Sequence, residues 1–405
     1  MNARNHVLAL EHADAMRRTG QTHLESGVTR EQHFVAELDR RDVGANGGDD
    51  AGAHMRRLVG GDDQPARELR LVELLDDEMV IQRFERGVAE WLPFQHGLHD
   101  TPCVRVGRQD VPVTNPDKVF FPATGLTKLD LVTYYVGVAE LCLPHLRRRP
   151  FHMKRFPNGV EQDFFHQKRV PANHPDYVDE VLVRFPSGHS TVFAIVDNAP
   201  ALAWVANLGC IELHTWHSRV PAVERPDYLL IDLDPTSDGQ WAFVREIALV
   251  VRDVLDELGL HSYPKTSGAT GLHILVPIKP ELMFPEVRRF AKAVAVEVER
   301  RIGAQAIATT TWRVADRVGV FVDYGQNARD RTIASAYSVR PVADARVSAP
   351  LAWDEVASVE PGAFTVETMP ARIAAVGDPT SGMWRNPPAL GPRFPQLGLE
   401  PPSDR

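Results

Sequence analysis

The stretch YLLIDLDP, residues 228–235, decides the fold and the chemistry of this sequence, because it ends a run of apolar residues with two aspartates. A short apolar run bounded by turn residues is typical of a buried β-strand. Side chains two residues apart on a strand share a face, so Asp232 and Asp234 point one way while Ile231 and Leu233 point the other. The two carboxylates therefore converge on one face of a predicted sheet.

Two carboxylates so close together raise each other's pKa unless a cation lies between them, and a hard divalent metal ion is the natural partner of their oxygens. The simpler alternative is that Asp234 caps the segment that begins at Pro235 and that Asp232 faces solvent. A third acid favours the metal. In GVFVDY, residues 319–324, alternation puts Asp323 on one face of another strand, from which it can join the pair.

A glycine-rich turn lies between the two aspartate strands, in TSGATGLHI, residues 266–274. Its glycines permit a tight turn whose backbone N–H groups can face an anion, and Ser267 and His273 add donors to a phosphate. A lone SGxxGxH pattern is more often a simple β-turn. Beside three candidate metal ligands, it indicates a phosphate site.

Strands and helices alternate through most of the chain, which predicts an α/β (α+β) fold with a mixed sheet flanked by helices. One helix is predicted at 127–147, with Thr127 as N-cap, Asp130 in a capping-box position and Pro150 beyond its end. Amphipathic periodicity predicts two further helices, at 240–260 and 285–302. The predicted strands are residues 190–196, 211–216, 228–234, 271–278 and 319–324.

Composition divides the chain into three predicted parts. Residues 1–110 are rich in Gly, Asp, Arg and His, with one helical segment around 65–90, which predicts a poorly ordered or loosely helical N-terminal extension. Residues 111–345 carry the alternating elements and are the predicted catalytic domain. Residues 346–405 are rich in Pro and Ala and are predicted to form a C-terminal extension.

The formal net charge of −9 over 405 residues argues against a nucleic-acid partner for the chain as a whole. The sign reverses locally, because residues 145–169 hold seven Lys and Arg against Glu161 and Asp163. Only seven lysines occur beside 38 arginines, and four of the seven lie between 118 and 168, so these lysines are candidates for specific contacts. No run of 18 apolar residues and no basic-then-apolar leader occurs, which predicts a cytoplasmic protein.

The D-x-D-P-T pattern also fits the haloacid dehalogenase phosphatases, in which the first Asp is the nucleophile and the second the general acid. That family needs a further acidic pair after a glycine, and Gly377-Asp378, followed by Pro379 and Thr380, matches it weakly.

Between about 111 and 345 the chain carries, in this order, the motifs NPDKVFFP, TK, MKRFPNG, FF followed by QK, IELHTW, IDLDP, TSGATGLHI, FVDYGQN and AYSVR. This ordered set resembles the polymerase domain of bacterial end-joining ATP-dependent DNA ligases, a branch of the archaeo-eukaryotic primase superfamily. The resemblance implies a primase-polymerase core and a template-dependent nucleotidyltransferase. Such an enzyme would fill short gaps or extend DNA ends in repair such as non-homologous end joining, prefer ribonucleotides and be able to prime. A non-catalytic DNA-end-binding adaptor that keeps the same fold is a third interpretation.

The resemblance implies a role for individual residues. Two divalent ions, Mn²⁺ in preference to Mg²⁺, would be bound by Asp232, Asp234 and Asp323. The nucleotide would be bound by His214 near the sugar, by Phe165, and at the triphosphate by Ser267, His273 and Arg340. DNA would be bound by Asn115, Lys118 and Lys128, which match a pocket for the downstream 5′-phosphate, and by Lys154, Phe164 and Lys168.

The sequence departs from the family pattern in three places. Thr270 stands where a Lys is common, His166 separates FF from QK, and the basic residues before Asp323 are reduced to Arg313 and Arg317. No ligase adenylation motif or nuclease domain is recognisable. The expected protein is a stand-alone polymerase in the bacterial cytoplasm and nucleoid. Its expected partners are DNA with gaps or 5′-phosphorylated ends, nucleoside triphosphates, and a DNA ligase and a Ku-type end-binding protein in trans, with no membrane.

Overall fold

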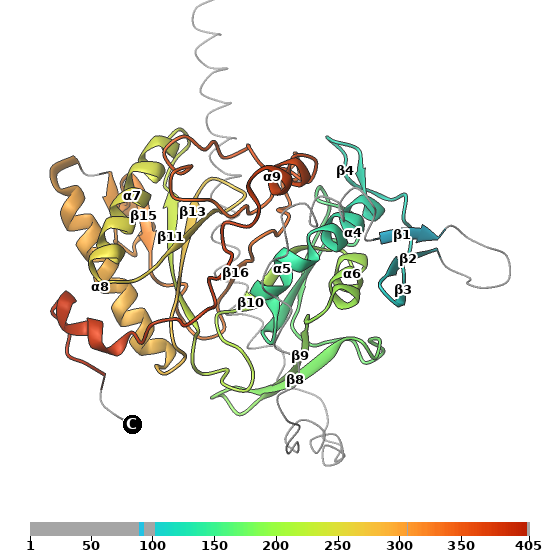
Figure 1. The fold of residues 1–405 in the computed structure, drawn as a ribbon, viewed down its shortest axis with the longest axis horizontal. Helices are drawn as coiled ribbons and strands as arrows, with labels where there is room; N and C mark the ends of the chain where they lie inside the picture. The colour runs from blue at the N-terminus through green and yellow to red at the C-terminus, as the bar shows by residue number, and fades with distance from the viewer. Residues whose placement is uncertain (1–88, 93–101, 306, 403–405) are drawn as a thin grey trace, which may run out of the picture. The chain divides into compact units, whose positions relative to one another are not determined.

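The computed structural model describes residues 89–92, 102–305 and 307–402, and its core is built from two β-sheets with helices packed on them (Figure 1). None of the helices in these ranges is long and apolar enough to cross a membrane. This mixed architecture confirms the predicted fold class.

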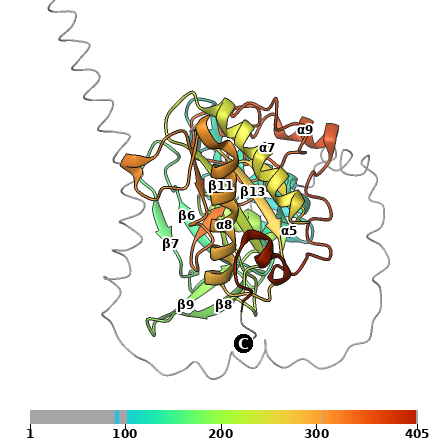
Figure 2. The ribbon, with the colours of Figure 1, turned by 90° about the vertical axis from the view of Figure 1, so that its left-hand side faces the viewer.

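The five-stranded sheet carries the YLLIDLDP segment at its centre. Its order is β12-β13-β11-β15-β14, and every neighbouring pair is antiparallel except β14 and β15. Two helices cover one face of it (Figure 2). The strands are β11 (Tyr228–Pro235), β12 (Tyr263–Thr266), β13 (Leu272–Pro277), β14 (Ala308–Thr309) and β15 (Val320–Asp323), and the helices are α7 (Trp241–Glu257) and α8 (Phe284–Ile302).

Alternation along β11 divides its side chains between two environments. Leu229, Ile231 and Leu233 are fully buried and pack with apolar residues of α7 and α8. Asp232 and Asp234 are therefore on the opposite face, away from both helices. The predicted division of this segment between a core face and a functional face is confirmed.

A second sheet lies beside the first, in the order β16-β10-β6-β9-β8 with β7 paired to β6. Many of its buried residues form a cluster with helices α4 to α6, while Val183, Phe193 and Trp216 form a separate cluster with Phe185. The strands are β6 (Pro150–Arg155), β7 (Phe165–Gln167), β8 (Asp179–Arg184), β9 (Ser190–Ile195), β10 (Cys210–Trp216) and β16 (Thr332–Ala334), and the helices are α4 (Lys128–Gly137), α5 (Ala139–Leu146) and α6 (Ala199–Asn207).

The helix predicted at 127–147 is two helices, α4 and α5, so that prediction was wrong in its continuity. The capping box at its start is present, with Thr127 as N-cap and Asp130 at N3. The break falls at Val138, directly after Gly137, the residue type after Pro least suited to a helix interior. Pro144 inside α5 has no N–H to donate, which weakens the second helix further.

The two sheets meet along β11 and β16. Tyr228 and Leu230 of β11 form a buried cluster with Leu275 of β13, Ile333 of β16 and Met383. Lys265 of β12 crosses between the sheets, because its Nζ donates to the Ala334 carbonyl of β16 at 2.9 Å. The face of β11 that carries the aspartates is therefore turned toward the second sheet.

Small elements precede the second sheet. Strands β1 (Ala89–Leu92), β2 (Cys103–Val106) and β3 (Gln109–Pro112) form a three-stranded antiparallel sheet, and β4 (Val119–Phe121) pairs with β5 (Leu126–Thr127). The first three strands lie before or across the predicted boundary at residue 110. The helical segment predicted around 65–90 falls outside the described residues up to 88, and residues 89–90 belong to β1.

The chain after residue 345 packs into both cores. Val347 and Ala349 belong to the cluster of the second sheet, while Leu351 and Phe394 belong to that of the first. The elements of this segment are α9 (Met369–Val376) and the 3₁₀ helix η3 (Gly391–Leu397). Folded elements and core residues continue across residues 110 and 345. The division of the chain at these two positions stays a prediction.

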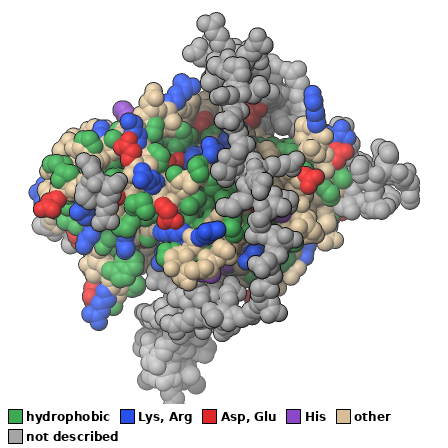
Figure 3. Space-filling view, turned by 90° about the horizontal axis from the view of Figure 1, so that it is seen from below, with side chains coloured by type: hydrophobic (Ala, Val, Ile, Leu, Met, Phe, Trp, Pro, Cys, Tyr) green, Lys and Arg blue, Asp and Glu red, His purple; other side chains and the backbone are tan. Residues whose placement is uncertain are grey.

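Charged side chains of both signs are intermixed with apolar ones on the face in Figure 3. Neither positive nor negative side chains dominate this part of the surface.

Candidate active site

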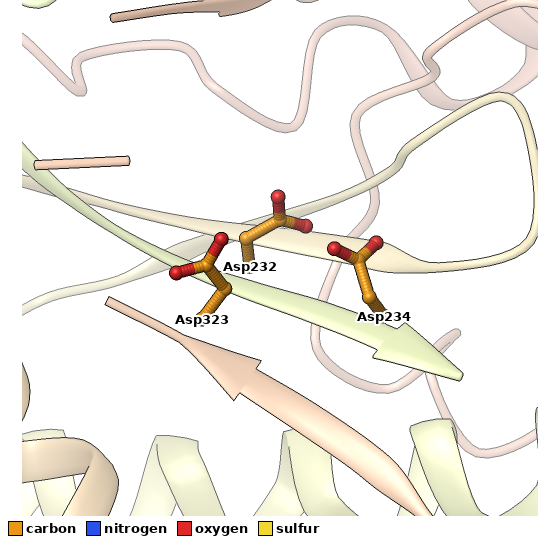
Figure 4. Close-up of side chains that lie close together, drawn as sticks. All are labelled: Asp232, Asp234 and Asp323. Carbon is orange, nitrogen blue, oxygen red and sulfur yellow. The ribbon is translucent and has the colours of Figure 1, made fainter. Parts of the chain in front are cut away.

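Three carboxylates converge on the face of the five-stranded sheet that is free of helices (Figure 4). Asp232 and Asp323 are direct partners in the antiparallel pairing of β11 with β15, and Asp234 follows two residues along β11. One oxygen of each residue lies within 4.8 Å of those of the other two. The sequence expectation that Asp323 meets the pair from another strand is confirmed as geometry.

The electrostatics of this cluster favour a cation. Burial, with the charges of Asp234 and Asp323, raises the pKa of Asp232 well above its usual range. Desolvation and Asp323 raise the pKa of Asp234 to about 6, and burial also raises the pKa of Asp323. The buried Oδ1 of Asp232 has no hydrogen-bond partner among the described residues. Oxygen ligands of this charge and spacing fit hard divalent ions such as Mn²⁺ or Mg²⁺.

The glycine-rich turn after β12 lies against the cluster. A Cβ at Gly271 would meet the Leu233 carbonyl oxygen at 2.2 Å and an Asp234 oxygen at 3.5 Å, so only a glycine permits this approach. Ser267 Oγ accepts from the N–H groups of Ala269 and Gly271 at 3.1 and 3.0 Å. Those two N–H groups are thus directed at Ser267, and the Ser267 hydroxyl proton is the donor that the turn can offer to a phosphate.

His273, on β13, lies between the acids and a buried lysine. Its Nε2 is 3.3 Å from Asp232 Oδ1, and its Nδ1 is 2.6 Å from Nζ of Lys265. Lys265 also donates to Ala334 O and to Ser348 Oγ at 2.6 Å. Desolvation and the charges of Lys265 and Arg340 hold the pKa of His273 well below its usual range.

Lys265 is a site residue that the sequence interpretation missed. Its signal was available, because Lys265 is one of only seven lysines and stands immediately before the TSGATG turn. A lysine inside a buried strand needs hydrogen-bond partners for its Nζ. His273, Ser348 and the Ala334 carbonyl supply three partners for Nζ.

A buried carboxylate on the second sheet was also missed. Glu212 of β10 forms ion pairs with Lys154 Nζ and Arg340 Nε, both at 2.8 Å, and lies 3.7 Å from His214 Nε2. Burial alone would raise its pKa, but Arg340, His214 and Lys154 outweigh it and hold the pKa of Glu212 well below its usual range. Alternation in IELHTW, which puts Glu212 on the face of His214, was the available signal.

Arg340 connects the two sheets at the site. Its Nη1 donates to the Ser267 carbonyl at 2.8 Å while its Nε pairs with Glu212. The structure therefore brings together Ser267, His273, His214 and Arg340, four of the five residues expected around the nucleotide, and no contact joins the fifth, Phe165, to them among the described residues.

Phe164 and Phe165 present two exposed rings at the edge of the second sheet. Lys154 Nζ lies 4.4 Å from the centre of the Phe164 ring, and the Arg155 guanidinium lies 5.2 Å from that of Phe165. Exposed aromatic faces backed by cations are suited to nucleobase stacking. Lys168 Nζ lies 5.9 Å from the centre of the Phe185 ring, and its expected contact with DNA stays a prediction.

Asn115 and Lys118 line a surface pocket together with Asp117. Lys118 Nζ donates to the Pro157 carbonyl at 2.8 Å, and the buried Lys128 donates to the carbonyl and hydroxyl of Thr114 at 2.7 and 2.8 Å. Desolvation and the charge of Lys118 lower the pKa of Lys128 to about 8. Two neighbouring cations, one of them partly desolvated, form a site suited to an anion.

Asp378, the acid that a haloacid dehalogenase mechanism would need beside the pair, has a structural role. Its Oδ1 accepts from the hydroxyls of Tyr337 and Thr380, both at 2.7 Å, and from the N–H of Thr380 at 2.9 Å. The acid that joins Asp232 and Asp234 in the described part of the chain is Asp323. This arrangement does not favour the phosphatase alternative.

Comparisons with known proteins agree with this geometry. The family described as "LigD, primase-polymerase domain" matches residues 127–380. The multifunctional non-homologous end joining DNA repair protein LigD of Mycobacterium tuberculosis H37Rv is 36% identical over 279 residues, which are 67% of this chain and 36% of that protein. The bifunctional non-homologous end joining protein LigD of Bacillus subtilis is 31% identical over 319 residues, 76% of this chain and 51% of that one.

A solved structure shares the fold. The polymerase domain from Mycobacterium tuberculosis Ligase D, in complex with DNA, superimposes with a TM-score of 0.64 at 35% identity, covering 69% of this chain and all of that one. The chain spans about a third to a half of the length of the two curated relatives that it matches. By sequence and by structure, this chain belongs to the LigD primase-polymerase domain family.

Proposed function

We propose that the chain is a template-dependent nucleotidyltransferase that fills short gaps or extends DNA ends in double-strand-break repair by non-homologous end joining. The observation that carries the proposal is the convergence of Asp232, Asp234 and Asp323 on one face of adjacent strands. Membership of the LigD primase-polymerase family supports the same reaction.

Asp232, Asp234 and Asp323 would hold two divalent ions, which would supply activation of a primer 3′-hydroxyl and stabilisation of the leaving pyrophosphate. The protein's own groups position the reactants. The Ser267 hydroxyl and the Arg340 guanidinium are joined through the Ser267 carbonyl, so both can contact one triphosphate. The ring of His273 is held by Lys265 beside Asp232, which fixes a further polar group at the same place.

The nucleic acid would contact the second sheet and the Lys118 pocket. Phe164 and Phe165 would stack on a template base and on the incoming base, a contact that tolerates any sequence. Lys118, Lys128 and Asn115 would bind the 5′-phosphate of the downstream strand. His214 would lie near the sugar of the incoming nucleotide, and we propose that ribonucleotides are preferred there and that the enzyme can also prime.

The names of the relatives support a role in end joining, and the solved polymerase domain was obtained with DNA. We extend this to partners that would act with the chain, namely an ATP-dependent DNA ligase and a Ku-type end-binding protein. Mn²⁺ is the proposed metal ion, with Mg²⁺ as the alternative.

Extension of a one-nucleotide-gapped duplex tests the proposal. The substrate is made with and without a 5′-phosphate at the gap, and each ribo- and deoxyribonucleotide is supplied with Mn²⁺ or Mg²⁺. We expect template-directed addition with release of pyrophosphate, faster on the phosphorylated gap and with a higher kcat/KM for ribonucleotides. Release of inorganic phosphate without primer extension would instead support a phosphohydrolase, and tight binding without turnover would support a DNA-end adaptor.

A further inference from the structure

The loop between β14 and β15, residues 310–319, exposes large apolar side chains. Trp312 is 52% exposed, Val314 62% and Val318 61%. Among the tryptophans whose burial the structure describes, Trp312 is exposed and the others are buried or half-buried. An indole kept in water on a loop beside a catalytic centre is suited to contact a ligand that arrives there.

The indole lies on the face of β15 that carries Asp323. Phe321 and Asp323 are two residues apart on this strand and share that face. The ring centres of Trp312 and Phe321 are 6.3 Å apart, with their planes at 72°. A Cβ at Gly325 would lie 2.6 Å from Cζ3 of Trp312 and 2.9 Å from Oδ1 of Asp323, so the indole and the carboxylate are immediate neighbours.

Arg317 holds the loop in this position. Its guanidinium lies 3.6 Å from the centre of the Phe321 ring, its Nε donates to the Thr311 carbonyl at 3.1 Å, and its Nη2 donates to the Trp312 carbonyl at 3.0 Å. The indole is thus positioned before a ligand binds, and little conformational entropy is lost when a flat partner stacks on it.

The position of Trp312 selects its partner. Phe164 and Phe165, the platforms for the template and incoming bases, lie at β7 on the other sheet. The strand to be extended must bring its 3′-hydroxyl to the three carboxylates, so its last base is the one that comes next to Asp323. We propose that Trp312 stacks on the terminal base of the strand being extended, an inference that rests on the proposed function.

The charge of the loop agrees with a nucleic-acid partner. Arg313 is on the surface next to Trp312, and its nearest ion-pair partner among the described residues is Asp316, at 3.5 Å. A cation beside an exposed aromatic ring is the combination that binds single strands and strand ends, with the ring on a base and the cation near a phosphate.

Binding of a labelled primer–template, measured by fluorescence anisotropy without nucleotide, tests the proposal on the full chain. Trp312→Met keeps an apolar side chain against Phe321 but removes the aromatic ring. This variant should weaken binding by roughly five- to a hundredfold, the effect of losing one stacked base. Trp312→Phe keeps a ring and should retain most of the affinity. Val314→Ala removes an equally exposed side chain from the same loop and should change nothing.

A primer whose 3′-terminal nucleotide lacks its base completes a double-mutant cycle. If Trp312 stacks on that base, the wild type should lose affinity for the abasic primer, and Trp312→Met should lose little more. Equal losses from Trp312→Met on both primers would overturn the proposal, as would equal losses from Val314→Ala and Trp312→Met.

Two further readouts keep the test decisive. If circular dichroism shows that Trp312→Met is unfolded, quenching of wild-type tryptophan fluorescence by the ordinary primer but not by the abasic one supports the contact, and equal quenching overturns it. If the wild type binds with the expected dependence on Trp312 but extends no primer with either metal, nucleotidyl transfer fails and the stacking contact stands.

Discussion

Two residue environments carry most of the proposed chemistry. Asp232 and Asp323 are buried carboxylates held opposite each other by strand pairing, and both have a raised pKa. Lys128 is a buried ammonium with a lowered pKa next to Lys118. In each case burial destabilises the charged form of the side chain, and a ligand of opposite charge would restore it. These are therefore the residues whose replacement is most informative.

Replacement of Asp323 by Ala should reduce primer extension by roughly a hundredfold or more, because it removes one of three groups that position charge at the reacting atoms. Binding of the gapped duplex should stay within about twofold of the wild type, because a negatively charged carboxylate does not attract the DNA phosphates. Asp253→Ala, which removes an exposed acid on α7, on the helix-covered side of the sheet, is the matched control. Near wild-type extension by Asp323→Ala would contradict the metal assignment.

The preference for a 5′-phosphate should decline as the pH rises. Lys128 has a pKa of about 8, below its ordinary 10.5, so it is charged at pH 7 and mostly neutral at pH 9. The phosphate keeps its second negative charge over this range. The affinity ratio of the phosphorylated to the unphosphorylated gap should therefore fall by up to about tenfold between pH 7 and 9.

Lys128→Arg provides the control for this pH effect, because a guanidinium stays protonated throughout the range. This variant should keep a preference for the phosphorylated gap that does not change with pH. If the wild type shows the same flat profile, Lys128 does not contact the phosphate.

At the scale of elements, the site depends on how β11 is paired on both edges. Pairing with β15 brings Asp323 opposite Asp232, and pairing with β13 brings His273 opposite the same residue. A shift of either neighbour by one residue would turn its functional side chain to the helix-covered face. The close approach of Gly271 to the Leu233 carbonyl fixes the end of the β11–β13 pairing at the site.

Gly271→Ala should therefore lower both stability and activity. The new Cβ would lie 2.2 Å from the Leu233 carbonyl oxygen, so the backbone must move, at a cost of about 1 to 3 kcal/mol in the free energy of unfolding. The movement displaces Asp234 and the turn together, and kcat should fall more than stability alone explains. Gly391→Ala is the control, because a Cβ at this position would meet no other atom within 4 Å, and it should leave the melting temperature and primer extension unchanged.

At the scale of the molecule, two sheets contribute different functions to one site. The five-stranded sheet carries the acids, the turn and Trp312, and the second sheet carries Glu212, His214, Lys154 and Phe164. Arg340 and Lys265 connect them by hydrogen bonds and an ion pair. The nucleotide and the template would therefore be bound between elements that are far apart in the sequence.

Removal of residues 1–88 should leave gap filling and its phosphate preference unchanged, because every proposed site residue follows residue 110. The cut precedes β1, which begins at Ala89. A deletion that continued to residue 105 would also remove most of β2, including the buried Val104, and should lower the melting temperature. Loss of extension by the shorter deletion, in a variant that folds by circular dichroism, would show that the N-terminal segment takes part in the reaction.

The sequence by itself determined the elements whose signals are local. The two-residue period of a strand places Asp232 and Asp234 on one face, whatever else the strand packs against. The capping box at Thr127, the helices α7 and α8 and the glycine-rich turn follow from neighbours within a few residues, and all of them are present. The order of motifs also predicted the family. The prediction of a single helix at 127–147 was wrong, because the first helix ends at Gly137 and a second one begins after it.

Only the tertiary structure decided which distant residues complete the site. Glu212 between Lys154 and Arg340, Lys265 behind His273, and Trp312 beside Asp323 join residues from different strands and loops. No local pattern specifies these contacts, because they depend on the register between strands and on the meeting of two sheets. Burial then raises the pKa values of Asp232, Asp234 and Asp323, so that the cluster favours a cation, a property that exposed carboxylates lack.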